Sequence, residues 1–455
     1  MKRIFFIGIG GIGMSAIARF MSLLGKDVAG YDKVSTPLTD ALMREGIRIH
    51  FSDDIRLIPE EFMKQESTLV IYTPAIPSGH HELTFFREKG FLVIKRAEAL
   101  GMIVKNSKGI AVAGTHGKTT VSSMIAHLLK DSQLGCNAFL GGISKNLNSN
   151  LLLNLNSEYT VVEADEFDRS FLQLHPLIAV VTSMDADHLD IYKTYQNLKD
   201  SFNQFIAQVR RDGLVIYKEG LSLNLPSGLE AYTYSLDSLT AGYAPVNVVK
   251  TGFLYRFSLR TPEGTIDSLE LGVYGKLNLE NATAALAVAH LLGLDEKSMR
   301  TALASYSGVQ RRFDVRIETD KQVYIDDYAH HPEELKAFIG SVKEALPGKK
   351  LTGIFQPHLY TRTRDFASEF AESLSMLDNV ILLDIYPARE EPIPGVTSQI
   401  IFNLLKNIGI KLIVKREQIF HFISDLDPEV LLTMGAGDID QLVEPIQNLL
   451  IATKK

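Results

Sequence analysis

The 455-residue sequence has a single cysteine, Cys136, and this scarcity excludes two kinds of structure. One thiol cannot form a disulfide within the chain, and it has no second thiolate with which to build a cysteine-rich metal site. We therefore expect Cys136 to be a small, buried hydrophobic residue.

Long apolar segments and a basic excess are also missing. The longest apolar runs are well short of the roughly 18 to 20 residues that a membrane span needs, and the N-terminal MKRIFFIGIGGIG leads into a glycine turn instead of a signal-peptide cleavage site. The net charge is -7, whereas nucleic acid and anionic membranes favour a basic surface. We expect a cytosolic protein that has neither a nucleic-acid nor a membrane partner.

The sequence contains no internal repeat of roughly 20 to 50 residues and no low-complexity tract, which excludes solenoids and disordered arms. It does contain short apolar runs that alternate with helical segments, as in βαβ units. This alternation begins three times and predicts an α/β protein. The polar stretch 219–271 is expected to be richer in short strands and turns. The predicted domains are 1–100, 101–311 and 312–455.

A first glycine cluster, GIGGIG, follows a predicted strand and opens a predicted helix. The backbone N–H groups of such a turn, together with the positive end of the helix, face an anion. The pattern favours NAD(P) or FAD but fits a nucleotide-sugar diphosphate as well, because both contain a pyrophosphate; a merely tight turn is a third interpretation. An acid at the end of the next strand lies roughly where a ribose-binding acid is expected. The residues assigned to this site are Gly8, Gly10, Gly11, Gly13 and Asp32.

A second glycine loop, GTHGKTT, also lies between a predicted strand and a predicted helix. It resembles a shortened phosphate-binding loop, since the full fingerprint GxxxxGK[ST] requires glycine where this chain has Val112. Gly114 and Gly117 allow the backbone to curl around phosphates, and Lys118 supplies a cation. The other assigned members are Thr115 and His116, which shape the loop, and Thr119 and Thr120, either of which offers a hydroxyl to Mg²⁺.

Acidic residues follow two further predicted strands. The segment EADEFDRS begins with Glu163, and TSMDADHLD contains His188 among carboxylates. Acids that leave the carboxyl end of a strand beside a phosphate loop are placed to bind Mg²⁺, which prefers oxygen ligands. Glu163 is the stronger candidate, whereas Glu166 and Asp168 better fit a solvated acidic turn. His188 fits a ligand and a structural residue equally.

Two strand-to-helix junctions in the third domain carry further polar side chains. They are IDDYAHHPEE, where Pro332 predicts a helix start, and FQPHLYTRTRD. Arginine at such a junction clamps a carboxylate or phosphate as readily as it caps a helix. The pattern alone leaves both interpretations open.

Taken in order, nine motifs resemble those of the Mur ligases of bacterial peptidoglycan synthesis, and the resemblance covers essentially the whole chain. They are GIGGIGMSAIA, GTHGKTT, EADEFD, DHLD, NLENATAALA, GVQRRFDV, DDYAHHP, FQPHLYTRTRD and PAREEPIPGVTS. The last two are similar to the alanine-adding branch of that family. The resemblance implies a Rossmann-like N-terminal domain, a central P-loop ATPase domain with a mostly parallel sheet, and a C-terminal Rossmann-like α/β domain.

The implied activity is that of an ATP-dependent ligase that uses Mg²⁺. It would join L-alanine to the lactyl carboxylate of UDP-N-acetylmuramate through an acyl phosphate, and the first glycine loop would then bind the UDP-sugar. A tripeptide ligase of murein recycling is the alternative within the same chemistry. An NAD(P)-dependent dehydrogenase, suggested by GIGGIG alone, is the alternative of another class.

Matching positions also imply roles for single residues. Lys118 would hold the ATP phosphates, Arg312 would lie near the γ-phosphate, and Thr119, Glu163 and His188 would coordinate or position Mg²⁺, with His188 a candidate general base. The implied nucleotide contacts are Asn278, Asn281, Asp327, Tyr328 and His330, and the implied contacts of the substrate carboxylate and amino acid are His358 and Arg362. The chain departs from the usual family residues at Ser183, Leu277, Leu359 and Arg389.

Overall fold

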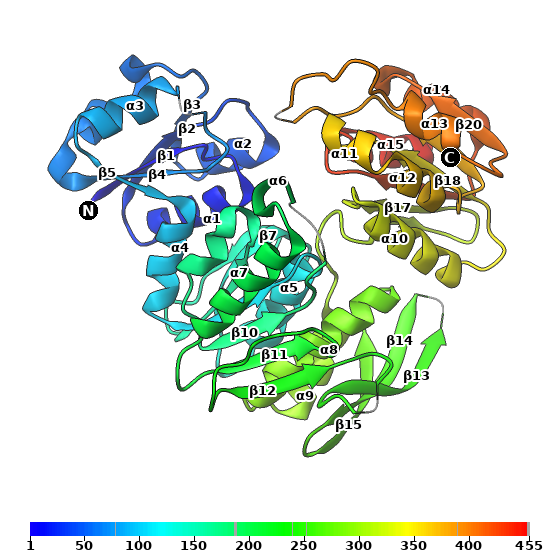
Figure 1. The fold of residues 1–455 in the computed structure, drawn as a ribbon, viewed down its shortest axis with the longest axis horizontal. Helices are drawn as coiled ribbons and strands as arrows, with labels where there is room; N and C mark the ends of the chain where they lie inside the picture. Colours follow the sequence, from blue (N-terminus) through cyan, green and yellow to red (C-terminus); the bar gives the residue numbers. More distant parts are fainter. Residues whose placement is uncertain (78, 186–188, 239, 252, 389, 453–455) are drawn as a thin grey trace. The chain divides into compact units, whose positions relative to one another are not determined.

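A computed structural model of the chain describes residues 1–77, 79–185, 189–238, 240–251, 253–388 and 390–452 (Figure 1). These residues form two compact units. The first comprises Met1–Val249, Arg256–Gly272 and Leu279–Ser307, and the second comprises Lys250–Tyr255, Val273–Asn278 and Gly308–Lys455. None of the described helices is both long enough and apolar enough to cross a membrane.

The N-terminal residues build a sheet that is parallel throughout. Its strand order, β3-β2-β1-β4-β5, is that of a Rossmann-like fold. Ile4 and Phe6 pack in the core cluster that includes α1 and α4, whereas Phe5 and Ile7 pack in the cluster that includes α3. The elements are β1 (Arg3–Ile7), α1 (Ile12–Leu23), β2 (Asp27–Tyr31), α2 (Pro37–Arg44), β3 (Arg48–His50), β4 (Thr68–Tyr72), α3 (His81–Glu88), β5 (Leu92–Lys95) and α4 (Arg96–Lys105).

A second sheet in the same unit has the order β12-β11-β10-β6-β9-β7-β8. Neighbouring strands are parallel except for β7 and β8. Because β6, β9 and β10 are neighbours, the loops after their carboxyl ends meet at one edge of the sheet. The elements are β6 (Lys108–Ala113), α5 (Lys118–Lys130), β7 (Asn137–Ser144), β8 (Ser149–Leu152), β9 (Tyr159–Ala164), the 3-10 segment η4 (Phe167–Gln173), β10 (Ile178–Val181), α6 (Leu189–Tyr192), α7 (Tyr195–Ala207) and β11 (Leu214–Lys218).

The polar stretch 219–271 contributes four strands, as expected, but three of them are eight residues long and therefore not short. β12 (Glu230–Tyr234) pairs with β11 at the edge of the second sheet. The other three, β13 (Ala244–Thr251), β14 (Leu254–Thr261) and β15 (Gly264–Leu271), form a separate sheet in that order. The helices α8 (Lys276–Leu291) and α9 (Glu296–Ser305) follow.

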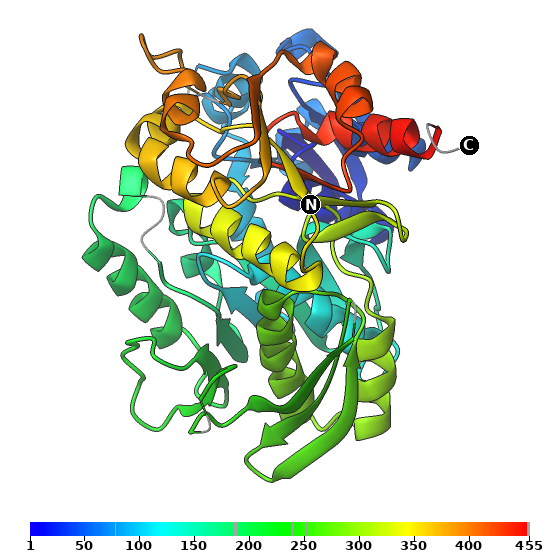
Figure 2. The same ribbon diagram turned by 90° about the vertical axis from the view of Figure 1, so that its right-hand side faces the viewer.

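The second unit holds a sheet of order β16-β17-β21-β18-β19-β20, parallel except for β16. Its two faces are covered by different helices (Figure 2): Ile325 and Leu432 pack in the cluster with α10, α12 and α13, and Tyr324 and Leu431 in the cluster with α14 and α15. The elements are β16 (Asp314–Glu318), β17 (Val323–Asp327), α10 (Pro332–Ala345), β18 (Leu351–Phe355), α11 (Tyr360–Asp365), α12 (Ala367–Leu374), β19 (Asn379–Leu382), α13 (Gln399–Leu404), β20 (Ile410–Ile413), α14 (Ile419–Leu426), β21 (Val430–Met434) and α15 (Asp440–Ala452).

The structure confirms the predicted α/β class with mostly parallel sheets. Pro332 is the first residue of α10, as predicted. Cys136 is fully buried, and burial raises the pKa of its thiol to about 12. It is therefore a core residue, as expected.

Candidate functional site

The loop between β6 and α5 is shaped by two glycines with positive φ, 140° at Gly114 and 82° at Gly117. A Cβ atom on Gly114 would lie 2.1 Å from the Thr182 hydroxyl oxygen, and one on Gly117 would lie 2.8 Å from the Asn281 side-chain oxygen. Only glycine fits at either position, because both the backbone conformation and the available space exclude a side chain. The loop is therefore tightly packed, and Asn281 lies against it.

Lys118, the first residue of α5, makes an ion pair with a buried carboxylate. Its ammonium donates to the carbonyl oxygen of Gly114 over 2.6 Å and lies 2.8 and 3.0 Å from the two carboxylate oxygens of Glu166. Burial alone would lower the pKa of Lys118, but the carboxylates of Glu166, Glu163 and Asp165 outweigh it and raise that pKa. Lys118 is therefore a fixed cation directly after the glycine loop.

The position of Glu166 corrects the prediction that it belongs to a solvated acidic turn. Its side chain is fully buried beside Lys118. Asp165, the preceding residue, is directed to Arg96, whose Nη2 donates to it over 3.1 Å. The two consecutive acids thus bind different cations. Asp168, 41% exposed and 3.4 Å from the Lys95 ammonium, fits the surface turn that was expected.

Two oxygen-bearing side chains lie together beside the loop. The Thr119 hydroxyl donates to Glu163 over 2.7 Å, and a Cβ on Gly141 would lie 2.0 Å from the same carboxylate oxygen, so the neighbouring strand leaves room for it. Thr120 is buried on the same helix. Among the described residues no three His, Cys, Asp or Glu side chains gather as a metal site. His188, the predicted third member, lies outside the described residues.

This pair of oxygens fits Mg²⁺. That ion is usually held by one or two protein oxygens and completes its shell with water and substrate phosphates. The Thr119 hydroxyl at the start of α5 and the Glu163 carboxylate near the end of β9 are oxygen ligands of the kind that this ion prefers.

Two residues after β10 hold the loop in place. The Thr182 hydroxyl donates to the carbonyl oxygens of Ala113 and His116, and the Ser183 hydroxyl accepts from the His116 amide over 2.8 Å. Ser183 also lies 2.9 Å from the Thr115 hydroxyl. Sequence analysis did not identify Thr182 and noted Ser183 only as a departure from the family. The available signal was a pair of hydroxyl residues directly after a buried strand.

The first glycine loop precedes α1, and the N-terminus of this helix has no capping side chain. Gly8 has a φ of 85°, and the amide of Gly10 donates to Asp32 over 2.7 Å, which fixes the predicted ribose-binding acid against the loop. Gly11 is the N-cap of α1 and has no side chain to cap it, and the first turn contains no acid. Gly13 adjoins Arg96, whose Nη1 would lie 2.7 Å from a Cβ placed there. Such a turn suits an anion.

In the second unit, Asp327 ends β17 and organises the loop that follows. Its two carboxylate oxygens accept hydrogen bonds from the amides of Phe313 and Ala329, over 2.6 and 2.8 Å. Burial raises the pKa of Asp327 to about 6, against the opposing effect of Arg312. Asp327 therefore holds the loop through two hydrogen bonds, and its carboxyl group has a higher pKa than that of an exposed aspartate.

The two adjacent arginines of GVQRRFDV have different tasks. Arg311, with a φ of 63°, makes a 3.1 Å ion pair with the buried Asp326 and donates to the carbonyl of Gly435. Both guanidinium groups lie over the Tyr328 ring, at 5.3 Å from its centre for Arg311 and 4.9 Å for Arg312. Arg311 is thus committed to the fold, which is compatible with the nucleotide role predicted for Arg312.

Of the remaining predicted residues of this unit, His330 lies beside Tyr328, with ring centres 5.3 Å apart, and His358 lies beside His330. His330 is 3.1 Å from the Tyr328 carbonyl and 3.2 Å from Glu334, and its ring centre is 5.8 Å from that of His358. Burial lowers the pKa of His330 to about 4; Glu334 opposes this shift, and Arg362 and Arg312 reinforce it. The imidazole is therefore neutral near pH 7.

Leu359 and Leu277, two of the residues that differ from the usual family residues, lie in described parts of the chain. Leu359, the N-cap of α11, has a φ of 70°, and its amide donates to the carbonyl of Tyr386 over 2.9 Å. A non-glycine residue in this conformation is strained, so the turn that carries His358 is held by its surroundings. Leu277 is exposed, and Arg389 lies outside the described residues. Asn278, one turn before Asn281, donates to the carbonyl of Tyr274 over 2.6 Å.

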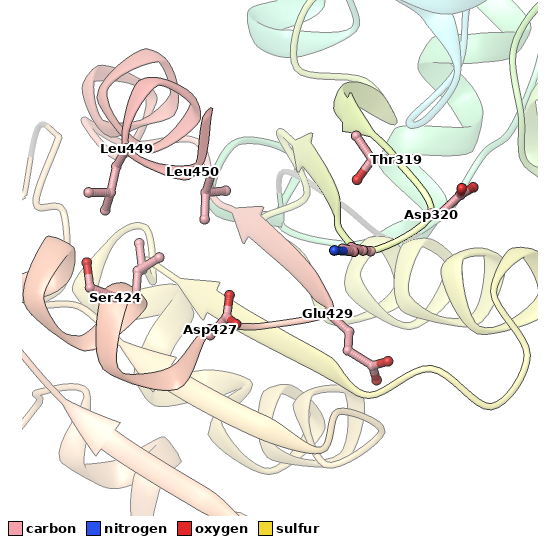
Figure 3. A pocket seen from close by; sticks show the side chains of 9 residues that line it. Thr319, Asp320, Ser424, Asp427, Glu429, Leu449 and Leu450 are labelled. Carbon is pink, nitrogen blue, oxygen red and sulfur yellow. The ribbon is translucent and has the colours of Figure 1, made fainter. Parts of the chain in front are cut away.

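A separate pocket of about 840 Å³ in the second unit holds none of the predicted site residues (Figure 3). It lies where β17 and β21 begin, whereas Asp327 lies where β17 ends. Ligands in parallel α/β sheets bind at the carboxyl ends of the strands, so this pocket is a poor candidate for the site. Its lining consists of Thr319, Asp320, Lys321, Ile423, Ser424, Asp427, Glu429, Leu449 and Leu450.

Comparison with known families gives three matches along the chain. The model described as "Mur ligase family, catalytic domain" matches residues 3–108, "Mur ligase middle domain" matches 112–289, and "Mur ligase, glutamate ligase domain" matches 311–437. Together these matches extend over most of the sequence.

Relatives of similar length share about half of the residues. The chain is 51% identical to the UDP-N-acetylmuramate–L-alanine ligase of Porphyromonas gingivalis over 453 residues, 99% of each chain. It is 52% identical to the ligase of the same name from Parabacteroides distasonis over 449 residues, 98% of this chain and 97% of the relative.

Solved structures agree with these matches. The crystal structure of the UDP-N-acetylmuramate-alanine ligase of Thermotoga maritima is 28% identical, with a TM-score of 0.82 over 98% of this chain and 99% of that one. A murein peptide ligase of Psychrobacter arcticus, 20% identical with a TM-score of 0.71 over 99% of each chain, shares the fold.

Proposed function

The chain belongs to the Mur ligase family, and from this premise we propose that it joins L-alanine to the lactyl carboxylate of UDP-N-acetylmuramate at the expense of ATP. The observation that carries the proposal is 51% identity, over 99% of both chains, with a relative named for this reaction. The reaction belongs to the synthesis of peptidoglycan precursors. An ATP-consuming step on a UDP-sugar fits a cytoplasmic enzyme.

The chemistry requires activation because a carboxylate is a poor acyl donor. One carboxylate oxygen attacks the γ-phosphorus of ATP, the bond to ADP breaks, and an acyl phosphate forms. The neutral amine of L-alanine then attacks the acyl carbon and a tetrahedral oxyanion forms. The nitrogen gives up one proton to a general base, and phosphate leaves as the amide is completed. Charge spreads over the phosphoryl oxygens in the first step, and fixed cations stabilise that charge.

Lys118 is the central cation in this proposal. It lies at the entrance of a glycine loop and keeps its proton because of the surrounding carboxylates. Arg312 is the second cation, and it would act when the C-terminal residues close over bound ATP, which would also exclude water from the acyl phosphate. We assign the remaining nucleotide contacts to Asn278, Asn281, Asp327, Tyr328 and His330.

Thr119 and Glu163 would hold Mg²⁺, with His188 as the further predicted ligand. When bound, Mg²⁺ would neutralise charge on the ATP phosphates. The 2.7 Å hydrogen bond between the hydroxyl and the carboxylate supports the assignment, since it brings two oxygen donors to one point.

The two other substrates are assigned to separate places. The open first turn of α1 supports Gly8, Gly10, Gly11, Gly13 and Asp32 as the UDP-sugar site. His358 and Arg362 are assigned to the substrate carboxylate and the amino acid. The corresponding domain limits are 1–100, 101–311 and 312–455.

Phosphate release by the purified full chain tests the proposal. The reaction would contain ATP, Mg²⁺, UDP-N-acetylmuramate and one of L-alanine, glycine, L-serine or the L-alanyl-D-glutamyl-diaminopimelate tripeptide. We expect the fastest release with L-alanine, and ¹⁸O placed in the lactyl carboxylate should appear in the released phosphate. Faster turnover with the tripeptide would favour the recycling ligase. Binding of NADH, with no response to UDP-sugars, would favour the dehydrogenase.

A further inference from the structure

Arg96, at the start of α4, lies between the first glycine loop and the acidic loop after β9. On one side its Nη1 would be 2.7 Å from a Cβ on Gly13, so the absence of a side chain there makes room for the guanidinium. On the other side its Nη2 donates to Asp165 over 3.1 Å. The side chain is 20% exposed, so part of it remains accessible to a ligand.

On the side that faces Gly13, the first turn of α1 contains no acidic residue, and the Asp32 carboxylate is bound to the amide of Gly10. The first N–H groups of a helix have no partner within the helix, and α1 begins at a glycine N-cap with no acid in its first turn. By contrast, α2 begins with a capping box from Thr36 and Thr39. Arg96 therefore adds a fixed cation to a helix end that is already positive, an arrangement suited to an anion with several oxygens.

On its other side, Arg96 contacts Asp165 in the acidic loop that adjoins the second glycine loop. Asp165 also accepts a hydrogen bond from the amide of Phe167, which fixes the turn of the acidic loop. The next residue after Asp165 is Glu166, which is paired with Lys118. A guanidinium has five N–H donors, and the hydrogen bond to Asp165 uses one of them.

We propose that Arg96 binds the diphosphate of the UDP-sugar through its Gly13 side while its Nη2 keeps Asp165 in place. It is then a substrate-binding residue that also positions the acidic loop beside Lys118. This inference rests on the proposed function, because it takes the first glycine loop as the diphosphate site. Arginine suits both tasks, since its planar fork can donate to two oxyanions at once.

Equilibrium binding of UDP and uridine to the full chain tests the inference. Uridine lacks the diphosphate, so the ratio of the two affinities isolates the phosphate contacts. In Arg96→Ala we expect UDP to bind more weakly, on the order of 10- to 100-fold, because a charge-assisted contact is lost. Uridine should bind as it does to the wild type. Arg96→Lys should lie between the two, and it decides the matter if Arg96→Ala does not fold.

Arg19→Ala is the matched control. Arg19 also bridges two parts of the first unit, with a 2.8 Å ion pair to Glu45 and a hydrogen bond to Asn150. Its loss should leave the UDP-to-uridine ratio unchanged. A ratio that stays at the wild-type value in Arg96→Ala and Arg96→Lys would overturn the inference and leave Arg96 as a tether of Asp165. A wild type that binds UDP no better than uridine would overturn the diphosphate site, and with it this part of the proposed function.

Discussion

Two clusters of buried ionisable groups, one at the carboxyl end of a strand in each unit, differ in whether the basic group keeps its charge, although burial raises the pKa of a carboxyl group in both, Glu166 and Asp327. In the first unit Lys118 and Glu166 are directly paired, and the pKa of Lys118 is raised in spite of its burial. In the second unit burial dominates: it raises the pKa of Asp327 to about 6 and lowers that of His330 to about 4. The carboxylates of Glu166, Glu163 and Asp165 together keep Lys118 charged. Glu334, 3.2 Å from His330, does not outweigh burial and the neighbouring arginines, so His330 and Asp327 move toward their neutral forms.

This difference suits different tasks. A loop that stabilises the charge of a transferring phosphoryl group needs a permanent cation. The second cluster contains two groups, Asp327 and His330, whose charge changes with pH. The comparison therefore predicts that variants of the first cluster alter catalysis and those of the second alter pH dependence.

The largest effect is expected for Lys118→Ala. It removes the cation on which phosphoryl transfer depends, and we expect the rate of phosphate release to fall roughly 10³-fold, as for comparable cationic groups in phosphoryl transfer. The rate with UDP-N-acetylmuramate and L-alanine measures this. UDP affinity, which depends on the other glycine loop, should not change. A variant with more than a tenth of the wild-type rate would remove Lys118 from the mechanism.

The second effect is expected for Glu166→Gln, which leaves Lys118 without its carboxylate. The unliganded protein should lose about 1–3 kcal/mol of unfolding free energy, because a buried charge loses its partner. Nucleotide phosphates then no longer compete with a directly paired carboxylate for the ammonium, so ADP should raise the melting temperature more in the variant than in the wild type. Thermal unfolding with and without ADP measures both. An equal shift by ADP in the two proteins would show that Glu166 does not compete with nucleotide.

The third prediction concerns pH in the second unit. Because the pKa of Asp327 is raised in the folded state, its contribution to stability is present below about pH 4 and is lost as pH rises through about 6. Because the pKa of His330 is lowered, its contribution is present above about pH 6.5 and is lost as pH falls through about 4. The two dependences oppose each other between these limits.

Removing one of these two titrating groups should reveal the pH dependence that the other one causes. In Asp327→Asn the unfolding free energy of the second unit should rise by about 2 kcal/mol from pH 4 to 6.5, and in His330→Gln it should fall by a similar amount. Urea denaturation at a series of pH values measures both slopes, with the wild type as the reference. Parallel pH curves for the two variants would contradict the assigned shifts.

The strands, loops and helices that carry both clusters could be predicted from the sequence, but the side-chain pairs within the clusters could not. Buried runs such as KGIAVA, followed by glycine and a helical pattern, predicted strand, loop and helix, and Pro332 marked the start of α10. The partner of Lys118 lies in the turn after β9, where Asp168 and Arg169 both have positive φ. Aspartate adopts this conformation more often than most residues, but arginine does not, so the sequence does not predict two such residues in a row. The hydroxyl pair after β10 is visible in the sequence, but the contacts of Thr182 with the glycine loop and those of Arg96 depend on the packing order of strands and helices, which local patterns do not encode.

The smallest effect is expected for Asp168→Asn, in the same acidic loop as Glu166. Asp168 and Lys95 form a 3.4 Å pair in which both side chains are more than 40% exposed. Water screens such a pair, so we expect a change of less than about 0.5 kcal/mol in unfolding free energy and no change in phosphate release. Denaturation and activity measured beside Glu166→Gln make this the matched control for that variant. A loss of stability as large as that of Glu166→Gln would mean that the whole acidic loop, and not the buried ion pair alone, holds Lys118 in place.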